Sequence, residues 1–193
     1  MHIFHGGRKH GKAECFLLMI ENDGNAVIQS LKQGVDCALD PGGTGRSLVH
    51  AAIELAKQKG AKHVYLTDLT RKEITPSQSF RLPWMYFLTT GQTWYESVIP
   101  GLRPVEGTFR IEKSRACVRN LSWASVMQAK PGIIVPVTIT DIDVTQPGSA
   151  MAVLQRIKEN REVAPTFFAE NEDKLVGICE IGYLYGMDWL VDL

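Results

Sequence analysis

The chain has 193 residues, and its 21 Lys and Arg residues are balanced by 21 Asp and Glu residues. This length suits one globular domain with or without an extension, and 45% hydrophobic residues exclude disorder over the whole chain. A net charge of zero argues against a dedicated nucleic-acid binder, which normally carries a basic excess. The chain also has no apolar stretch of transmembrane length and no signal-peptide pattern. We therefore expect a cytoplasmic protein that binds neither nucleic acid nor membrane.

The zero total hides two oppositely charged stretches. Residues 101–130 hold six basic and two acidic residues, whereas residues 161–193 hold two basic and seven acidic residues. These stretches either face each other or face different partners, so a protein partner or a homodimer stays open.

The four cysteines are far apart and form no CxxC pair; they are Cys15, Cys37, Cys117 and Cys179. This usage predicts free and mostly buried thiols in a reducing compartment. Three histidines lie near the N-terminus, where such residues are usually solvated, so we expect no metal site.

The first third of the chain predicts a hairpin or meander over residues 13–39. Its strands lie at Ala13–Glu21, Ala26–Leu31 and Val35–Leu39, and the turn sequence Asn-Asp-Gly-Asn separates the first two. A loop at Asp40–Gly45 then leads into a helix over Arg46–Lys59 and a strand over His63–Asp68. A strand, glycine loop, helix and strand in this order predict two parallel strands joined by a right-handed crossover.

The rest of the chain is less regular. The sequence predicts a loop at Arg71–Ser79, an aromatic-rich helix at Phe80–Ser97 with a weak point at residues 89–91, and further strands within Arg103–Val118. It then predicts a short helix at Ser122–Ala129, a strand at Ile133–Ile139 and a helix at Met151–Asn160. Pro136 places that strand at a sheet edge or a bulge. Residues 167–193 fit either a strand or a helix.

The glycine loop is typical of phosphate binding, because backbone N–H groups and a helix N-terminus both stabilise an anion. It departs from the triphosphate pattern GxxxxGK(S/T), since Asp40 stands at the first glycine and Arg46 replaces lysine. It departs from the dinucleotide pattern GxGxxG, since Leu48 stands at the third glycine. A tight turn before a helix, without a ligand, is the alternative interpretation.

Asp40–Gly45 resembles the pyrophosphate loop of the GNAT superfamily of N-acetyltransferases, with Asp in place of the usual Arg or Gln. The following GRSLVHAAIELAKQKGAKHVYLTDLT resembles that family's helix and strand, and TTGQTWYESVIPGLRPV resembles its next helix and exit turn. The resemblance covers residues 13–106 and is greatest to divergent acetyltransferase-like proteins of large DNA viruses. It implies an α/β fold with a mixed, mostly antiparallel central sheet flanked by helices. Residues 1–106 would form the acetyl-CoA-binding core and residues 107–193 a C-terminal extension packed on it.

The resemblance implies acetyl-CoA as cosubstrate and direct transfer of the acetyl group to a small amine or a protein amine. Its binding residues would be Leu39, Gly42, Gly43, Thr44, Gly45, Arg46 and Ser47. Tyr95 matches the tyrosine that protonates the leaving thiolate in many members of the family. Asp68 would hold or deprotonate the amine, with Glu96 and Asp36 as substitutes. The structural alternatives are an aromatic side chain packed on the sheet for Tyr95 and a turn acid before Thr70 for Asp68.

Two features favour a different function, a non-enzymatic binding protein on a degenerate acetyltransferase scaffold. The strand and two helices that precede the hairpin in the family have too few residues here, and residues 107–193 have no counterpart in it. A nucleotide-phosphate binder that uses the same loop is a third hypothesis.

Overall fold

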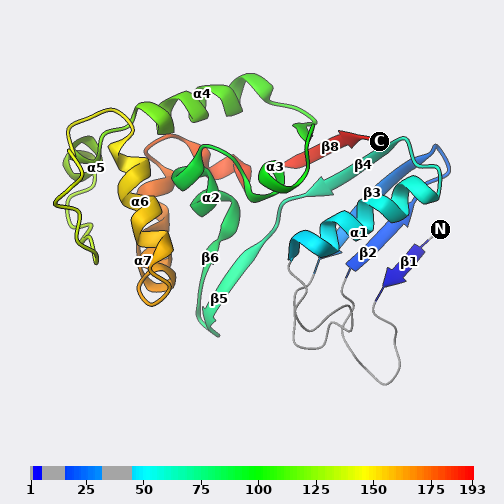
Figure 1. Cartoon of the computed structure of the whole chain (residues 1–193), viewed down its shortest axis with the longest axis horizontal. Coiled ribbons are helices and arrows are strands. Elements are labelled where there is room, and N and C mark those ends of the chain that lie inside the picture. Colours follow the sequence, from blue (N-terminus) through cyan, green and yellow to red (C-terminus); the bar gives the residue numbers. More distant parts are fainter. Residues whose placement is uncertain (1, 6–15, 32–44) are drawn as a thin grey trace. The chain divides into compact units, whose positions relative to one another are not determined.

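The computed structural model describes residues 2–5, 16–31 and 45–193, and these fall into two compact units. Unit 1 holds the described residues up to Thr67, together with Val98–Glu106 and Asp188–Leu193, and unit 2 holds Asp68–Ser97 and Gly107–Met187. Figure 1 labels the helices and strands. The expected boundary at residue 106 is only one of the points where the chain passes between the units, because the last residues belong to unit 1.

Unit 1 is built on a six-stranded sheet with the strand order β1-β2-β3-β4-β8-β7. The strands are β1 (His2–His5), β2 (Phe16–Ile20), β3 (Asn25–Leu31), β4 (His63–Thr67), β7 (Arg103–Pro104) and β8 (Asp188–Asp192). Only β3 and β4 pair in parallel among the described strands. The fold is therefore mixed α/β, with a mostly antiparallel sheet flanked by helices, as the sequence predicts.

Local sequence explains the first half of this sheet. The β2–β3 turn is held by Asp23, whose Oδ1 accepts the Asn25 N–H at 3.0 Å, and Gly24 has a positive φ of 87°. Helix α1 (Gly45–Gln58) buries an apolar stripe at helical spacing against β2 and β3. Its buried residues are Leu48, Val49, Ala52, Ile53 and Ala56. In the described chain the first parallel strand is β3; the expected strand Val35–Leu39 lies outside the described residues.

The C-terminal end of the chain supplies β8, which lies between β4 and β7. Trp189 pairs with Leu66 and is fully buried, and Leu190 and Val191 are also buried. The ambiguity of residues 167–193 thus resolves into a helix followed by a strand.

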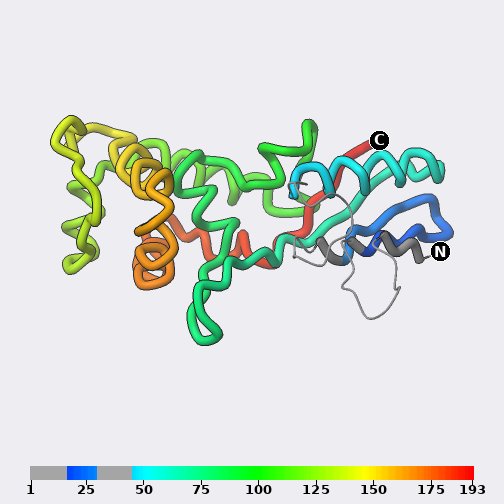
Figure 2. Tube along the Cα trace, turned by 60° about the horizontal axis from the view of Figure 1, so that its bottom comes forward, coloured from blue at the N-terminus to red at the C-terminus, as the bar shows by residue number. Residues whose placement is uncertain are grey.

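Unit 2 begins with the hairpin of β5 (Arg71–Thr75) and β6 (Gln78–Arg81), and its other regular elements are helices (Figure 2). Its α-helices are α2 (Leu82–Thr90), α3 (Trp94–Val98, which reaches into unit 1), α4 (Thr108–Asn120), α5 (Trp123–Ala129), α6 (Ser149–Glu159) and α7 (Ala164–Val176). A short 3-10 helix follows at Ile181–Leu184. The apolar core lies where α2, α6 and α7 pack together, with Phe87 and Ile157 fully buried.

Four element predictions between residues 71 and 139 are wrong, and one of them is the strand expected at Ile133–Ile139, where the structure has no regular element. The expected loop at 71–79 is largely the β5–β6 hairpin, and the single helix at 80–97 is interrupted at Gly91. Gly91 takes the left-handed conformation, and its N–H donates to the Phe87 carbonyl at 2.8 Å, which ends α2. The strands expected within 103–118 shrink to β7, because Ile111, Ser114 and Val118 recur at helical spacing and become the buried face of α4.

A disulfide joins Cys117 to Cys179, so the expectation of free thiols is wrong for this pair. The cysteines are 62 residues apart in sequence, yet their Cα atoms lie 5.7 Å apart. Helix α4 and the segment after α7 run past each other here, since the Ser114 hydroxyl donates to the Cys179 carbonyl at 3.0 Å. Sequence spacing alone does not reveal such a pairing. Cys15 and Cys37 lie outside the described residues.

Candidate functional site

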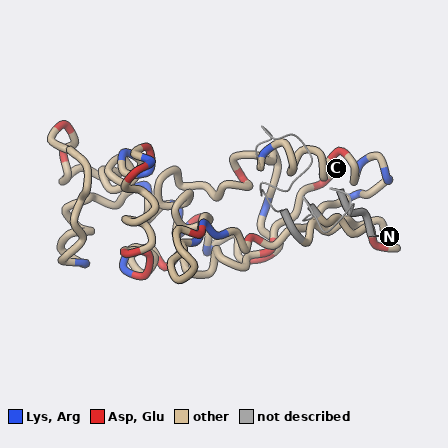
Figure 3. The backbone as a smooth tube through the Cα atoms, turned by 90° about the horizontal axis from the view of Figure 1, so that it is seen from below, with Lys and Arg blue, Asp and Glu red and all other residues tan. Residues whose placement is uncertain are grey.

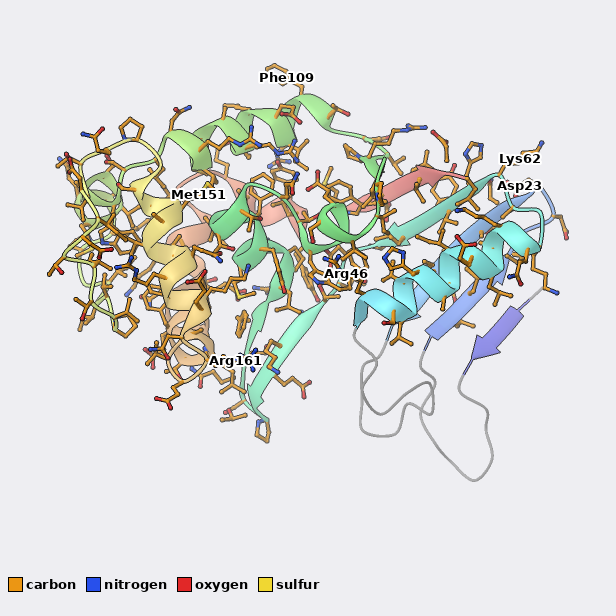
Figure 4. The ribbon with its side chains drawn as sticks, in the orientation of Figure 1. Asp23, Arg46, Lys62, Phe109, Met151 and Arg161 are labelled. Atoms are coloured by element: carbon orange, nitrogen blue, oxygen red, sulfur yellow. A yellow bond between two sulfur atoms is a disulfide. The ribbon has the colours of Figure 1, made fainter. Side chains whose placement is uncertain are left out.

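The predicted phosphate loop is described only at its C-terminal end. Gly45, Arg46 and Ser47 form the first turn of α1, whereas Leu39, Gly42, Gly43 and Thr44 lie outside the described residues. Arg46 is exposed (Figure 4), and the first turn contains no acidic residue. Because backbone N–H groups at a helix N-terminus have no partner within the helix, they carry partial positive charge. This turn is therefore electrostatically suited to an anion.

The parallel strands beside this turn stop pairing early. β3 pairs with β4 from Asn25–His63 to Ile28–Leu66, although β3 continues to Leu31. At the same point the β2–β3 register shifts, because Leu17 pairs with Ser30 while Leu18 pairs with Ile28. The extra residue, Gln29, is a β-bulge, which bends a strand and increases its twist. The last residues of β3 therefore make no ladder with β4.

Asp68 follows β4 and is fully buried in unit 2. Its Oδ1 accepts the Thr70 hydroxyl at 2.6 Å and the Thr70 N–H at 3.2 Å, while its Oδ2 is buried and has no hydrogen-bond partner among the described residues. Burial raises the pKa of Asp68 to about 6, and the two bonds from Thr70 partly oppose that rise. The geometry is that of the turn acid that was the structural alternative for this residue.

The structure brings Tyr95 within electrostatic range of Asp68. Tyr95 is 4% exposed, and burial, followed by the negative charge of Asp68, raises the pKa of its phenol well above its ordinary value. A general acid works best when its pKa lies near the working pH. The pKa of Tyr95 is instead raised further away from neutral pH. The Tyr95 ring packs edge-on against Trp94, with ring centroids 4.9 Å apart. These observations favour the packing role for Tyr95.

Glu96, which was an alternative to Asp68, already forms structural hydrogen bonds and an ion pair. Its carboxylate accepts the Thr93 N–H at 2.7 Å and the Arg115 guanidinium at 2.6 Å, while its own N–H donates to the Thr93 hydroxyl. This reciprocal arrangement is a capping box at the start of α3. The other substitute, Asp36, lies outside the described residues.

Sequence reasoning missed a cluster of cations and aromatic rings in unit 2. The Arg81 guanidinium lies 4.4 Å from the Trp84 ring centroid and 5.1 Å from that of Tyr185, and it pairs with Glu172 at 2.9 Å. Arg71 Nε donates to the Tyr185 hydroxyl at 2.7 Å. These residues come from β5, β6, the first turn of α2, α7 and the residue after the 3-10 helix, and no local motif marks them.

The described residues contain no group of three or more His, Cys, Asp or Glu side chains that could hold a metal ion. Among the described helices, none is both long and apolar enough to cross a membrane. Comparison with known protein families, with curated proteins and with solved structures found no match for this chain.

Proposed function

We propose that unit 1 binds acetyl-CoA and that the protein transfers its acetyl group to an amine. The observation that carries the proposal is the end of β3–β4 pairing at Ile28 and Leu66, beside the start of α1. In a strand–helix–strand unit the carboxyl ends of the strands and the helix N-terminus share one edge of the sheet, which is where ligands bind in α/β proteins.

Coenzyme A has two chemical features that suit this edge. Its pantetheine arm contains two amides, which can hydrogen-bond to the backbone of Gln29–Leu31 that β4 leaves unpaired. Its diphosphate is an anion, which the first turn of α1 and the exposed guanidinium of Arg46 would stabilise. The strand order and the resemblance of residues 13–106 support the same assignment.

The reaction is a direct acyl transfer. The neutral amine attacks the thioester carbonyl, a tetrahedral oxyanion forms, and the carbon–sulfur bond breaks as coenzyme A leaves and the amine nitrogen loses its proton. A backbone N–H of β3 next to the bulge at Gln29 would stabilise the oxyanion. We assign no proton transfer to Tyr95 or Asp68, because Asp68 is fully buried and Tyr95 is a weaker acid than an ordinary tyrosine.

Isothermal titration calorimetry tests the binding step. We expect acetyl-CoA and free coenzyme A to bind the full chain, and Arg46→Glu to weaken both by about tenfold, the loss of one charge-assisted contact. Lys59→Glu is the matched control, since it makes the same charge change just past the other end of α1, at an exposed side chain. Equal effects of the two variants would contradict a site at the first turn.

Two further outcomes separate the alternatives. If folded protein gives no heat with either ligand, the non-enzymatic binding protein is favoured; if ATP binds in preference to coenzyme A, the nucleotide-phosphate binder is favoured. Where binding is found, transfer is measured by the release of free thiol from acetyl-CoA in the presence of a small amine or a lysine-containing peptide.

A further inference from the structure

A β-branched segment in unit 2 is left without a strand partner. The sequence Ile133-Ile134-Val135-Pro136 predicts a strand, but the structure assigns no regular element to it. Exposure alternates along it, since Ile133 is 2% exposed and Ile134 is 80% exposed, and the next two residues repeat the pattern of inward and outward side chains. Such alternation is typical of an extended chain.

The backbone of this segment forms no hydrogen bond within the described structure. The nearest backbone bonds are Lys130 N–H to Val126 and Ile142 N–H to Ile139, on either side of it. Buried or ordered backbone groups are normally paired, and an extended row of unpaired N–H and C=O groups is a template for another strand. The prolines at 131 and 136 limit that row to Gly132–Val135, because proline has no N–H to donate.

A groove runs along the same segment. It has a volume of about 530 Å³, and its walls are the segment 132–136 on one side and α7 with the preceding turn on the other. Gly132, Ile134 and Pro136, which alternate along the segment, line the groove. Figure 1 shows the segment between α5 and α6 at the same end of unit 2 as α7. The run from Gly132 to Pro136 spans about 13 Å when extended, which matches a peptide of about five residues.

The charges of the groove are mainly acidic. Glu162 and Glu170 line it, are exposed, and form no ion pair with any described residue. The cation in the wall, Lys174, donates to the Asn171 side chain at 3.4 Å. The charged positions along the chain are marked in Figure 3. An occupant with lysine or arginine side chains is therefore complementary to α7.

We propose that this groove binds an extended basic peptide of a partner protein, which pairs as a strand with Gly132–Val135. The peptide backbone would hydrogen-bond to the segment, its apolar side chains would contact Ile134 and Phe167, and its cations would face Glu162 and Glu170. This surface lies wholly in unit 2, and the inference does not depend on the proposed acetyl-CoA site.

A fluorescein-labelled peptide of sequence Val-Lys-Val-Lys-Val tests the proposal in fluorescence anisotropy with the full chain. We expect saturable binding, and at least tenfold weaker binding of Val-Glu-Val-Glu-Val and of Val-Lys-Pro-Lys-Val, which reverse the charge and remove a central N–H. Equal binding of the three peptides would overturn the proposal.

Paired variants of the protein localise the effect. Val135→Pro removes one backbone donor, and Val135→Ala keeps it; we expect the first to weaken binding about tenfold more than the second. Glu170→Lys is expected to weaken binding about tenfold, whereas Asp173→Lys, an exposed site on α7 that does not line the groove, leaves it within about twofold.

Amide hydrogen exchange gives a readout that does not depend on any variant. The N–H groups of Ile133 and Val135, which face the same edge of an extended chain, should exchange rapidly in the free protein and slow by at least tenfold when the lysine peptide is bound. Slow exchange in the free protein at all concentrations would mean that these groups are already paired, which overturns the proposal. Slow exchange only at high protein concentration, with dimers in sedimentation, would assign the edge to a second copy of this chain and likewise overturn it.

Discussion

Replacing Asp68 by Asn should remove a specific part of the pH dependence of stability. The pKa of Asp68 is raised from its ordinary value of 3.8 to about 6, because the carboxyl group is buried and only the two bonds from Thr70 favour its charged form. The folded protein therefore binds this proton more tightly than the unfolded chain does. The stability that this group contributes is fully present below pH 3.8 and is lost as the pH rises through about 6.

The magnitude follows from the size of the shift. A rise of about 2 pKa units corresponds to about 3 kcal/mol between the two protonation states. Asp68 is fully buried, so solvent does not screen the effect. A typical domain is stable by about 5–15 kcal/mol, which makes this contribution measurable. Asn has the shape of Asp, still accepts both bonds from Thr70 through Oδ1, and does not titrate.

The assay is urea unfolding of the wild type and of Asp68→Asn between about pH 3.5 and 8. Unfolding is monitored by the fluorescence of tryptophans in unit 2, such as Trp84 and Trp123. Subtracting the two free energies at each pH cancels the groups that titrate alike in both proteins. We expect the difference between wild type and Asp68→Asn to change by about 3 kcal/mol across this range. Thr70→Val removes one bond to the charged form and should move the midpoint above 6. A difference that is constant with pH would refute the assignment of a raised pKa to Asp68.

Three other predictions follow from the packing. Replacing Cys117 and Cys179 by Ser should lower the free energy of unfolding by about 4 kcal/mol, because the disulfide closes a loop of 62 residues; urea unfolding measures the loss, and thiol alkylation before and after reduction verifies the bond. Glu96→Ala should cost about 3 kcal/mol by leaving the largely buried Arg115 guanidinium without this partner, and adding Arg115→Met should restore most of it in the same measurement. A fragment of residues 1–106 lacks β8 and should aggregate in sedimentation experiments, since β4 is left with an unpaired edge and β7 loses the strand that it pairs with.

The parts of the fold that the sequence predicts correctly depend on neighbours in the chain. The turn at Asp23 and Gly24 and the apolar stripe of α1 are local patterns, and both appear as expected. The strand β8 could not be predicted, because its place between β4 and β7 is set by partners that lie far away in sequence. The disulfide could not be predicted for the same reason, because Cys117 lies beside Cys179 only once α4 has packed against the segment after α7.

The candidate site likewise has one part that the sequence predicts and another that depends on tertiary packing. The first turn of α1 follows from its sequence. The early end of β3–β4 pairing coincides with the bulge at Gln29, and no residue pattern predicts either. The family resemblance implied that Tyr95 and Asp68 share one site, and the structure does bring them near each other. Their burial then changes their chemistry, because a buried phenol beside a buried carboxyl group holds its proton more tightly. The burial of these two side chains depends on tertiary packing, so it could not be predicted from the sequence alone.

The unpaired segment at 132–136 shows how side-chain packing can prepare a backbone for binding. A free β-branched chain would lose conformational entropy when it pairs with a partner strand, and this loss weakens association. Here Ile133 is buried in unit 2, and Val135 and Val137 are half-buried, so packing of alternate side chains already holds the chain extended. Because folding already fixes this segment, the segment itself loses little further conformational entropy when a peptide binds. The segment thus presents a preorganised edge without belonging to a sheet, and the prolines at 131 and 136 keep that edge short enough to limit pairing with longer strands.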